Sequence, residues 1–270
     1  MSLVIKNFFE KVIFDKKLLK VRNDIIQKKI NDVNNFFYIF NKDYSDNINL
    51  KQIQKLKSFK NLVFIGMGGS ILGAKASFSF LRKKIKKNVL FIDNLDQNKI
   101  FEVRKNIKKK TLFIIISKSG NTLETLTNLS SLKVSFNKSN SLIITEKDTN
   151  NLFNFAKKRR IPTIYHDKFV GGRFSILSKT GIVLFILMGL GKRKYFYKFS
   201  EIILNNKNFI KFSRGIQATS KYFLSKKYKS LICLNYSQDL NDCVYWFQQL
   251  FAESLGKKNK GLLPVLSEAP

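Results

Sequence analysis

The fold is decided by a stretch that reads NLVFIGMGGS at residues 61–70, and a similar run, TLFIIISKSGNT, follows at residues 111–122. Each run is an unbroken apolar segment that ends in glycines or hydroxyl-bearing residues. Continuous apolar strands of this kind are typical of parallel sheets covered by helices on both faces. Amphipathic segments separate them from further apolar runs at residues 89–92, 142–144 and 162–165. The pattern predicts an α/β fold with a doubly wound parallel sheet.

The rest of the chain divides into three segments around this sheet. Residues 1–57 place apolar side chains at helical spacing and contain no glycine, which predicts an N-terminal helical segment. Residues 58–200 hold the strand and helix alternation of a first α/β domain. Residues 201–270 carry one more apolar strand at 231–234 and a helix from about 242 to 255. We predict no further strand before the chain stops, and therefore expect only the beginning of a second α/β unit.

The chain is strongly basic. Its 270 residues include 50 Lys and Arg against 18 Asp and Glu, a formal net charge of +32. The basic residues are spread along the whole sequence, as in the runs at 108–110 and 157–160, and are not gathered in one arm or recognition helix. A dispersed excess favours a solvated surface over a specific nucleic-acid site. Polyanion binding stays open as an alternative class, and steep salt dependence would be its signature.

The cysteines and the apolar segments limit the cellular setting. Cys233 and Cys243 form no CxxC pattern and have no histidine nearby, so neither a disulfide framework nor a zinc site is predicted. Residues 1–20 mix Lys and Glu with apolar residues, unlike a signal peptide. The most apolar run, residues 181–190, is too short to span a bilayer. We expect a cytoplasmic protein with no metal site and no membrane partner.

The first candidate site is the glycine loop Gly66-Met67-Gly68-Gly69-Ser70, which lies between a predicted strand and a predicted helix. Glycines at such a turn let backbone N–H groups approach an anion at the helix N-terminus. A dinucleotide fingerprint would need a third glycine where this chain has Ile71, so a nicotinamide site is disfavoured even though Asp93 could imitate the ribose-binding acid. A tight turn without a ligand remains the alternative.

The second candidate is the loop at residues 117–122, which reads SKSGNT and again ends an apolar strand. Hydroxyls, a lysine and free backbone amides at the start of a helix suit a dianionic phosphate, which accepts several hydrogen bonds at once. One of these hydroxyls could serve only as a helix N-cap. Both candidate loops follow strands of one parallel sheet, so they lie at the edge where open α/β sheets bind ligands.

Two further motifs carry charged side chains. Arg173 follows Gly171 and Gly172, and a close turn there could aim its guanidinium at an anion, although an arginine beside a turn is more often a surface residue. Gln249 and Glu253 are four residues apart, hence on one face of an otherwise apolar helix. Desolvation on such a helix would raise the pKa of a carboxyl group toward the range of a general base. A surface glutamate beside Lys257 is the alternative.

In this order, the four motifs resemble those of the glucose-6-phosphate isomerase family, within the wider set of sugar-isomerase (SIS) domains. The SKSGNT loop is similar to the phosphate loop of SIS domains in general. The runs GGRFS at 171–175 and WFQQLFAESLGK at 246–257 are much more specific. The resemblance extends from roughly residue 60 to the end, and the N-terminal segment matches only in helical character.

This resemblance implies a SIS-type fold and the interconversion of glucose 6-phosphate and fructose 6-phosphate through a cis-enediol, without a metal or cofactor. Glu253 would be the catalytic base, and Arg173 would stabilise the enediolate charge. A homodimer is also implied. The substrate-binding residues would be Gly69, Ser70, Ser117, Lys118, Ser119, Thr122, Gly172 and Gln249, the serine and threonine loop holding the phosphate.

The sequence departs from the family pattern in two ways. The family loop usually carries Thr where Ser119 stands and a bulkier residue where Gly120 stands. The family also uses a ring-opening histidine and a lysine downstream of the base, whereas the single histidine here, His166, lies upstream. We therefore expect an incomplete enzyme with little activity. A non-catalytic sugar-phosphate sensor is the alternative, since a sensor needs the phosphate loop but no base at Glu253.

Overall fold

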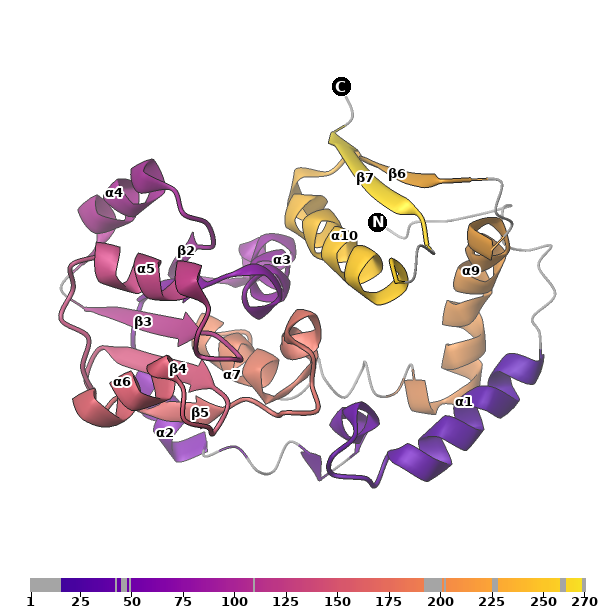
Figure 1. Cartoon of the computed structure of the whole chain (residues 1–270), viewed down its shortest axis with the longest axis horizontal. Coiled ribbons are helices and arrows are strands. Elements are labelled where there is room, and N and C mark those ends of the chain that lie inside the picture. Colours follow the sequence, from indigo (N-terminus) through magenta and orange to yellow (C-terminus); the bar gives the residue numbers. More distant parts are fainter. Residues whose placement is uncertain are drawn as a thin grey trace.

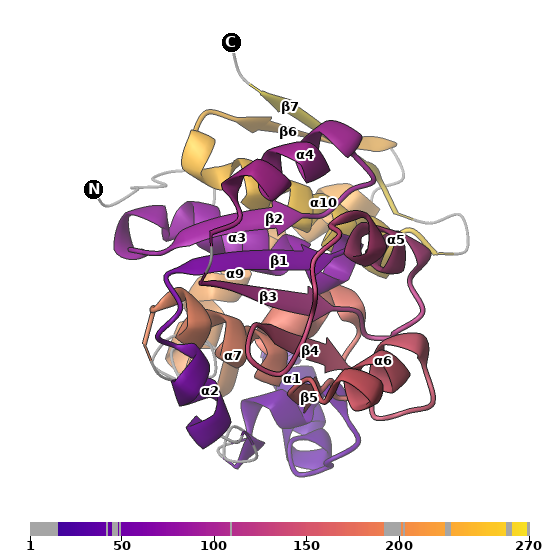
Figure 2. The same ribbon diagram turned by 90° about the vertical axis from the view of Figure 1, so that its left-hand side faces the viewer.

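The main body of the protein is a five-stranded parallel sheet in the order β2-β1-β3-β4-β5 (Figures 1 and 2). The computed structural model describes residues 16–41, 43–44, 48, 50–108, 110–191, 201, 203–224, 228–257 and 261–268. The strands are β1 (Asn61–Gly66), β2 (Asn88–Ile92), β3 (Thr111–Ile116), β4 (Ser141–Thr145) and β5 (Thr163–Tyr165). All neighbouring pairs are parallel, so the predicted doubly wound sheet is confirmed.

Helices cover both faces of this sheet. One face carries α4 (Gln97–Asn106), α5 (Leu123–Ser131) and α6 (Asn151–Arg159), which lie in front of the strands in Figure 2. The opposite face carries α2 (Leu50–Leu56), α3 (Leu72–Phe80) and α7 (Lys179–Met188). Short 3-10 helices connect the larger elements: η1 (Phe36–Phe40), η3 (Gly68–Ser70), η4 (Arg82–Lys84), η5 (Gly172–Leu177) and η6 (Gln238–Leu240).

The strand sequences explain why both faces are covered. Leu62 and Phe64 of β1 pack with α3 and α7, while Val63 and Ile65 point to the other face and pack with α4 and α5. Successive side chains of a strand alternate between faces, so a continuous apolar run needs a helical layer on each side. In β3 every residue is buried.

Helix α7 holds most of the apolar run that the sequence shows at residues 181–190. Every residue from Thr180 to Met188 except Phe185 is buried, which makes eight buried residues in this helix. The helix is an internal core element, because a helix that is apolar all round is buried in the protein. Among the residues that the structure describes, none of the helices has the length and apolar character needed to cross a membrane.

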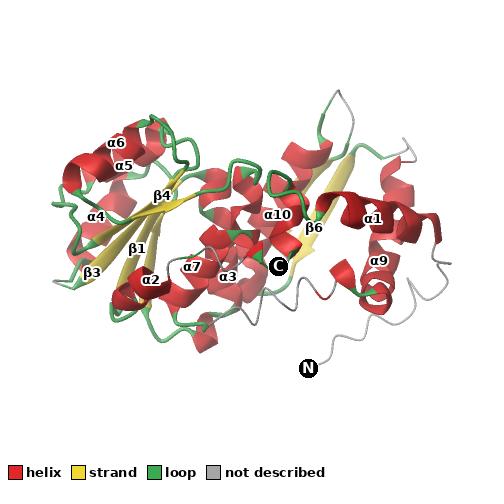
Figure 3. Cartoon of the chain, turned by 90° about the horizontal axis from the view of Figure 1, so that it is seen from below, coloured by secondary structure: helices red, strands yellow, loops and turns green. Residues whose placement is uncertain are grey.

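The N-terminal segment packs against the region that leads to Arg173. Helix α1 (Lys16–Lys29) lies beside α9 (Asn206–Leu224), and the buried Arg22 donates from Nε to the carbonyl oxygen of Ile203 at 2.9 Å (Figures 1 and 3). The ring of Phe36 packs on that of Phe174, with 5.2 Å between centroids. Within the predicted helical segment, the structure has helix at Lys16–Lys29, Phe36–Phe40 and Leu50–Leu56, and residues 1–15 lie outside the described residues.

The last part of the chain forms β6 (Ser230–Asn235), α10 (Asn241–Leu255) and β7 (Leu263–Glu268). Strands β6 and β7 pair in parallel, so the prediction of a single strand in this segment was wrong. A proline has no backbone N–H to donate, so Pro264 made a strand at this position unexpected. The structure nevertheless places it in β7, opposite Leu231. Helix α10 packs against α3 and thereby joins this segment to the first sheet (Figure 1).

Candidate active site

The glycine loop and the arginine loop meet at the carboxyl edge of the sheet. The turn η3 directly follows β1, and η5 approaches it so closely that a Cβ atom on Gly69 would lie 2.4 Å from the backbone nitrogen of Arg173. The Ser175 hydroxyl donates to the carbonyl oxygen of Gly69 at 3.0 Å. Only glycine permits this approach at position 69, so the two predicted motifs share one local structure.

Helix α10 adds the third motif to the same place. Gly68 adopts a φ of +52°, and a Cβ atom on it would lie 3.2 Å from Gln249 Nε2. One helical turn later, Glu253 Oε1 accepts a hydrogen bond from Gln249 Nε2 at 2.8 Å, and Glu253 Oε2 accepts one from Arg173 Nη1 at 3.1 Å. The structure therefore brings Gly69, Arg173, Gln249 and Glu253 together from segments far apart in the sequence.

The Glu253 carboxylate is partly open to solvent. Its side chain is 47% exposed, against 22% for that of Arg173. Of the two alternatives left open by the sequence, the exposed fraction is nearer to that of a surface glutamate, and Phe251 is the buried residue of α10 among those described. The carboxylate is held by an ion pair and an amide instead of by burial.

Two side chains without a predicted role, Ser254 and Trp246, hold Arg173 in position. Ser254 Oγ accepts a hydrogen bond from Arg173 Nε at 3.0 Å. The indole Nε1 of Trp246 donates to the backbone carbonyl oxygen of Arg173, also at 3.0 Å. Both residues lie within the WFQQLFAESLGK run, but a contact between residues more than 70 positions apart has no local signal in a sequence.

The predicted phosphate loop gathers its hydroxyls at the N-terminus of α5. Ser117 Oγ lies 2.9 Å from Thr122 Oγ1 and accepts from the backbone N–H of Gly120 at 3.1 Å. Ser119 Oγ lies 3.4 Å from Thr122 Oγ1. Thr122 occupies the N-cap position of α5, but its side chain makes no capping hydrogen bond. The hydroxyl cluster is therefore not used up as a helix cap, and it lies where an anion is favoured.

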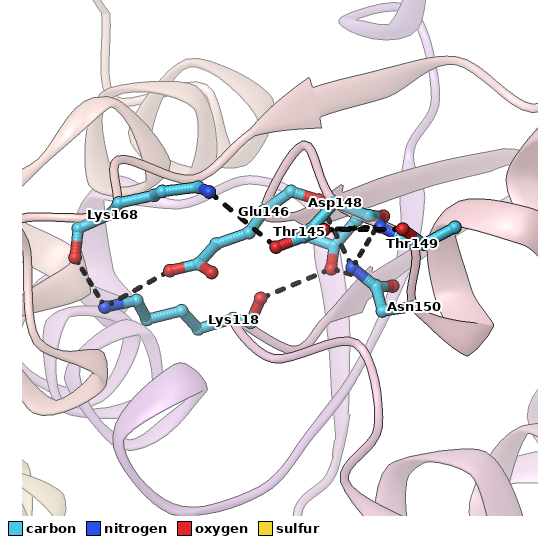
Figure 4. A network of polar contacts seen from close by, with 7 residues as sticks. All are labelled: Lys118, Thr145, Glu146, Asp148, Thr149, Asn150 and Lys168. Atoms are coloured by element: carbon cyan, nitrogen blue, oxygen red, sulfur yellow. Dashed lines mark hydrogen bonds and ion pairs between the residues drawn. The ribbon is translucent and has the colours of Figure 1, made fainter.

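The Lys118 ammonium bonds to residues outside this hydroxyl cluster. Figure 4 shows its ammonium between Glu146 Oε1, at 3.3 Å, and the carbonyl oxygen of Lys168, at 2.8 Å. Lys168 in turn forms an ion pair with Asp148 at 3.7 Å. The backbone of Lys118 is still part of the loop, and its place in phosphate binding remains a prediction.

The loop after β4 contacts the phosphate loop through several hydrogen bonds. The carbonyl oxygen of Lys118 accepts from the backbone N–H of Glu146 at 3.0 Å and from Thr145 Oγ1 at 3.4 Å (Figure 4). Gly120 has a φ of +66°, and a Cβ atom on it would lie 1.8 Å from Asn150 Oδ1. Asn150 also caps α6 by accepting from the backbone N–H of Phe153 at 2.8 Å. These contacts fix the loop conformation.

Four residues considered in the sequence lie outside this set of contacts: Ser70, Gly172, Asp93 and His166. The Ser70 hydroxyl has no hydrogen bond within the described residues, and a Cβ atom on Gly172 would meet nothing within 4 Å, so the substrate-binding roles of both remain predictions. Asp93 accepts from Lys75 Nζ at 2.8 Å, which gives this carboxylate a structural partner in place of a ribose. The buried ring of His166 follows β5, and desolvation lowers its pKa.

Across the described residues, no three His, Cys, Asp or Glu side chains come close enough together to hold a metal ion. What the arrangement offers is acid-base and electrostatic chemistry. A carboxylate and a guanidinium lie in contact at the same sheet edge as the predicted phosphate loop. That combination suits proton abstraction from a phosphorylated substrate whose transition state gains negative charge.

The chain is similar to proteins of one family. The family model for phosphoglucose isomerase matches residues 27–261. A glucose-6-phosphate isomerase of Methanocaldococcus jannaschii is 32% identical over 226 residues, which cover 81% of this chain and 56% of that protein. A glucose-6-phosphate isomerase of Mycoplasmopsis pulmonis is 29% identical over 284 residues, which cover 94% of this chain and 66% of that protein. The chain thus spans 56% and 66% of the lengths of these two relatives.

Solved structures agree in fold. A glucose-6-phosphate isomerase from Chlamydia trachomatis superposes with a TM-score of 0.62 at 23% identity, over 82% of this chain and 48% of that one. A tagatose-6-phosphate ketose/aldose isomerase from Escherichia coli gives a TM-score of 0.55 at 14% identity, over 83% of this chain and 62% of that one. Given the extent of the family match and the order of the four motifs, this chain belongs to the phosphoglucose isomerase family.

Proposed function

We propose that the chain carries the aldose-ketose isomerase site for glucose 6-phosphate and fructose 6-phosphate, with Glu253 as the catalytic base. The observation that carries this proposal is the contact of Glu253 with both Arg173 and Gln249 at the sheet edge that also holds the phosphate loop. Family membership and the names of the relatives support the same reaction.

The proposed reaction moves one proton between two carbons. Glu253 takes the proton from C2 of the open-chain aldose, which leaves a cis-enediolate with its charge on O1 and a hydroxyl on O2. A proton then moves from O2 to O1, and the protonated Glu253 gives its proton to C1, so that O2 becomes the ketose carbonyl. Negative charge develops on the enediolate oxygens, and the guanidinium of Arg173 stabilises it because the cation is already in place before the charge forms. The proposal needs no metal or cofactor, since these two groups supply the base and the electrostatic stabilisation.

The phosphate loop has a different task in this proposal. The hydroxyls of Ser117, Ser119 and Thr122, together with backbone amides at the start of α5, hold the substrate phosphate. Binding energy from this remote group orients C1 and C2 over the carboxylate. Gly69, Ser70 and Gly172 line the sugar between the two ends, and Gln249 orients the Glu253 carboxylate through the 2.8 Å hydrogen bond. A homodimer and a cytoplasmic location belong to the same proposal.

The decisive experiment measures conversion of fructose 6-phosphate in an assay coupled to glucose-6-phosphate oxidation. Glu253→Gln keeps the side-chain shape but removes its basicity, so we expect kcat to fall by roughly 10²-fold or more with little change in KM. Glu102→Gln is the matched control, because the exposed Glu102 carboxylate lies on α4 and pairs with Lys99, a residue of the same helix. Loss of less than about threefold in kcat would assign the base to another residue, since base removal normally costs far more.

The same measurements separate an enzyme from a sugar-phosphate sensor. A sensor would bind fructose 6-phosphate through the phosphate loop but would not convert it. Ser119→Asp places a carboxylate beside the bound phosphate and should abolish binding, measured by calorimetry. Because we expect little turnover from residues 1–270, the sensor would be favoured by fructose 6-phosphate binding that Ser119→Asp removes, together with no tighter binding of a hydroxamate that imitates the enediolate, which a site with a base and Arg173 should prefer.

A further inference from the structure

The contact between Arg173 and Glu253 uses a single nitrogen of the guanidinium. Nη1 donates to Glu253 Oε2 at 3.1 Å, while Nε donates to Ser254 Oγ at 3.0 Å. Within the described residues, Nη2 has no hydrogen-bond partner. Arginine and carboxylate groups in contact frequently form two parallel hydrogen bonds, because the guanidinium fork matches the two carboxylate oxygens. Here the guanidinium is oriented so that Nη1 is the one nitrogen that bonds to Glu253.

Three contacts hold the fork in this orientation. Ser254 occupies Nε, and the guanidinium carbon of Arg173 lies 4.9 Å from the centroid of the Phe174 ring, a cation–π contact. The Trp246 indole fixes the backbone of Arg173 through its carbonyl oxygen. Of these groups, Ser254 alone bonds to a nitrogen of the fork, and it directly follows the base in the sequence.

We propose that Ser254 is a positioning residue that keeps the Arg173 contact with Glu253 single and leaves the rest of the guanidinium to the substrate. This inference rests on the proposed isomerase function and deepens it. Without the serine hydroxyl, nothing bonded to Nε opposes rotation of the fork into a two-pronged ion pair with Glu253.

The chemistry explains why such a restraint matters. Glu253 Oε1 already accepts from Gln249, so a second arginine hydrogen bond would engage the carboxylate further and oppose its taking a proton. The same rotation would aim the free Nη2 at Glu253, away from the developing enediolate. Ser254 thus acts on both partners: the base keeps a free lone pair, and the cation keeps a free donor for the transition state.

Ser254→Ala tests the proposal in the full chain, with Ser254→Thr as the rescue variant. Because the lost orientation serves the transition state, we expect Ser254→Ala to lower kcat by about tenfold or more with KM changed less than twofold. Ser254→Thr retains the hydroxyl and should restore most of the rate. Ser79→Ala is the matched control, since the Ser79 hydroxyl bonds Asp242 and ties α3 to α10 without touching Arg173.

Binding of two probes gives a readout that does not depend on turnover. A hydroxamate of a phosphorylated sugar acid imitates the planar, anionic enediolate, whereas sorbitol 6-phosphate imitates only the open-chain substrate. Calorimetry should show about tenfold weaker hydroxamate binding by Ser254→Ala and unchanged binding of sorbitol 6-phosphate, because analogues of the transition state report interactions that the ground state lacks.

The outcomes separate this inference from the proposed function. If the unaltered chain converts fructose 6-phosphate or prefers the hydroxamate, and Ser254→Ala does the same, the positioning role is overturned while the isomerase function stands. A parallel loss of both probes, or an equal loss in Ser79→Ala, would show a merely structural role and also overturn it. If the unaltered chain binds neither probe, the proposed function fails and the inference fails with it.

Discussion

The backbone of Gly69 lies so close to that of Arg173 that a Cβ atom at position 69 would stand 2.4 Å from the arginine nitrogen and 2.6 Å from its Cα atom. Both neighbours are backbone atoms, which cannot move aside as a flexible side chain can. The two loops can therefore share this edge of the sheet only while residue 69 has no side chain.

The first prediction follows from this contact. Gly69→Ala should push η3 and η5 apart, lower stability by about 1–3 kcal/mol as overpacking does, and abolish sugar-phosphate binding. Thermal unfolding and calorimetry with fructose 6-phosphate measure the two effects. The control is Gly171→Ala, where the added Cβ would make an ordinary 3.5 Å contact with the Phe174 ring. Unchanged binding by Gly69→Ala would place the substrate away from this pair of loops.

The second prediction concerns the ion pair of Lys118 and Glu146. Glu146→Gln removes a negative charge beside the phosphate loop and frees the ammonium that this carboxylate holds at 3.3 Å. A dianion should then bind more tightly, by roughly threefold to tenfold, or about 0.7–1.4 kcal/mol. Calorimetry with inorganic phosphate at constant salt measures the change.

The matched control for Glu146→Gln is a second charge removal, outside the phosphate loop. Glu102→Gln removes an equal charge on the exposed face of α4 and should leave phosphate binding unaltered. Weaker binding by Glu146→Gln would show that the carboxylate supports the loop through Lys118 and does not compete for its ammonium.

Much of the first domain could be predicted because its information is local. Continuous apolar runs such as residues 112–116 predict strands that need cover on both faces, and the two core clusters on either side of β3 have that arrangement. Strand β7 could not be predicted in the same way. Its register opposite β6 includes Pro264, and a proline normally argues against a paired strand.

In the candidate site, too, contacts within one helix could be predicted from the sequence and contacts between distant segments could not. Gln249 and Glu253 were expected on one helix face because they are four residues apart, and their side chains do form a hydrogen bond. The partners of Arg173 were not expected, since Ser254 is 81 positions away in the sequence and meets it only through tertiary packing. The exposed state of Glu253 also depends on which side of α10 faces α3, which helical spacing alone does not fix.

The third prediction is that folding stability depends on pH through the buried side chain of His166. Its buried ring is held near Lys118, Asp167 and Glu146, and desolvation is the largest cause that lowers its pKa, although both acidic neighbours oppose that shift. The unfolded chain takes up a proton near pH 6.5, but the folded chain takes it up only at lower pH. The stability due to the neutral ring is therefore fully present above about pH 6.5 and is lost as pH falls toward the folded pKa.

The chain offers a clean measurement of this effect, because His166 is the single histidine in its sequence. Urea unfolding at pH 7.5 and pH 5.5 should show a loss of stability in the unaltered chain that His166→Gln reduces. Titration of the terminal amine is common to both proteins and cancels in the comparison. Equal losses in the two proteins would mean that His166 becomes protonated as readily in the folded chain as in the unfolded one.

The last prediction concerns the buried contact that ties the N-terminal segment to the loop before Arg173. The Tyr44 hydroxyl donates to Asp167 Oδ2 at 2.5 Å and accepts from the backbone N–H of Lys179 at 2.9 Å, while Lys179 Nζ donates to Asp167 Oδ1 at 2.9 Å. Tyr44 is 2% exposed, so its hydroxyl has no access to replacement water.

Tyr44→Phe removes the hydroxyl and leaves a charged acceptor and a backbone donor without their partner. Hydrogen bonds to charged groups contribute about 1.5–3 kcal/mol, so we expect the free energy of unfolding to fall by roughly 2 kcal/mol. Tyr236→Phe is the control, because Tyr236 is 81% exposed and the same change there should be nearly neutral. Urea denaturation measures both variants. Equal stability of Tyr44→Phe and the unaltered chain would show that the Tyr44 hydroxyl does not help to hold the N-terminal segment, and that its apolar cluster around Phe40 suffices at this contact.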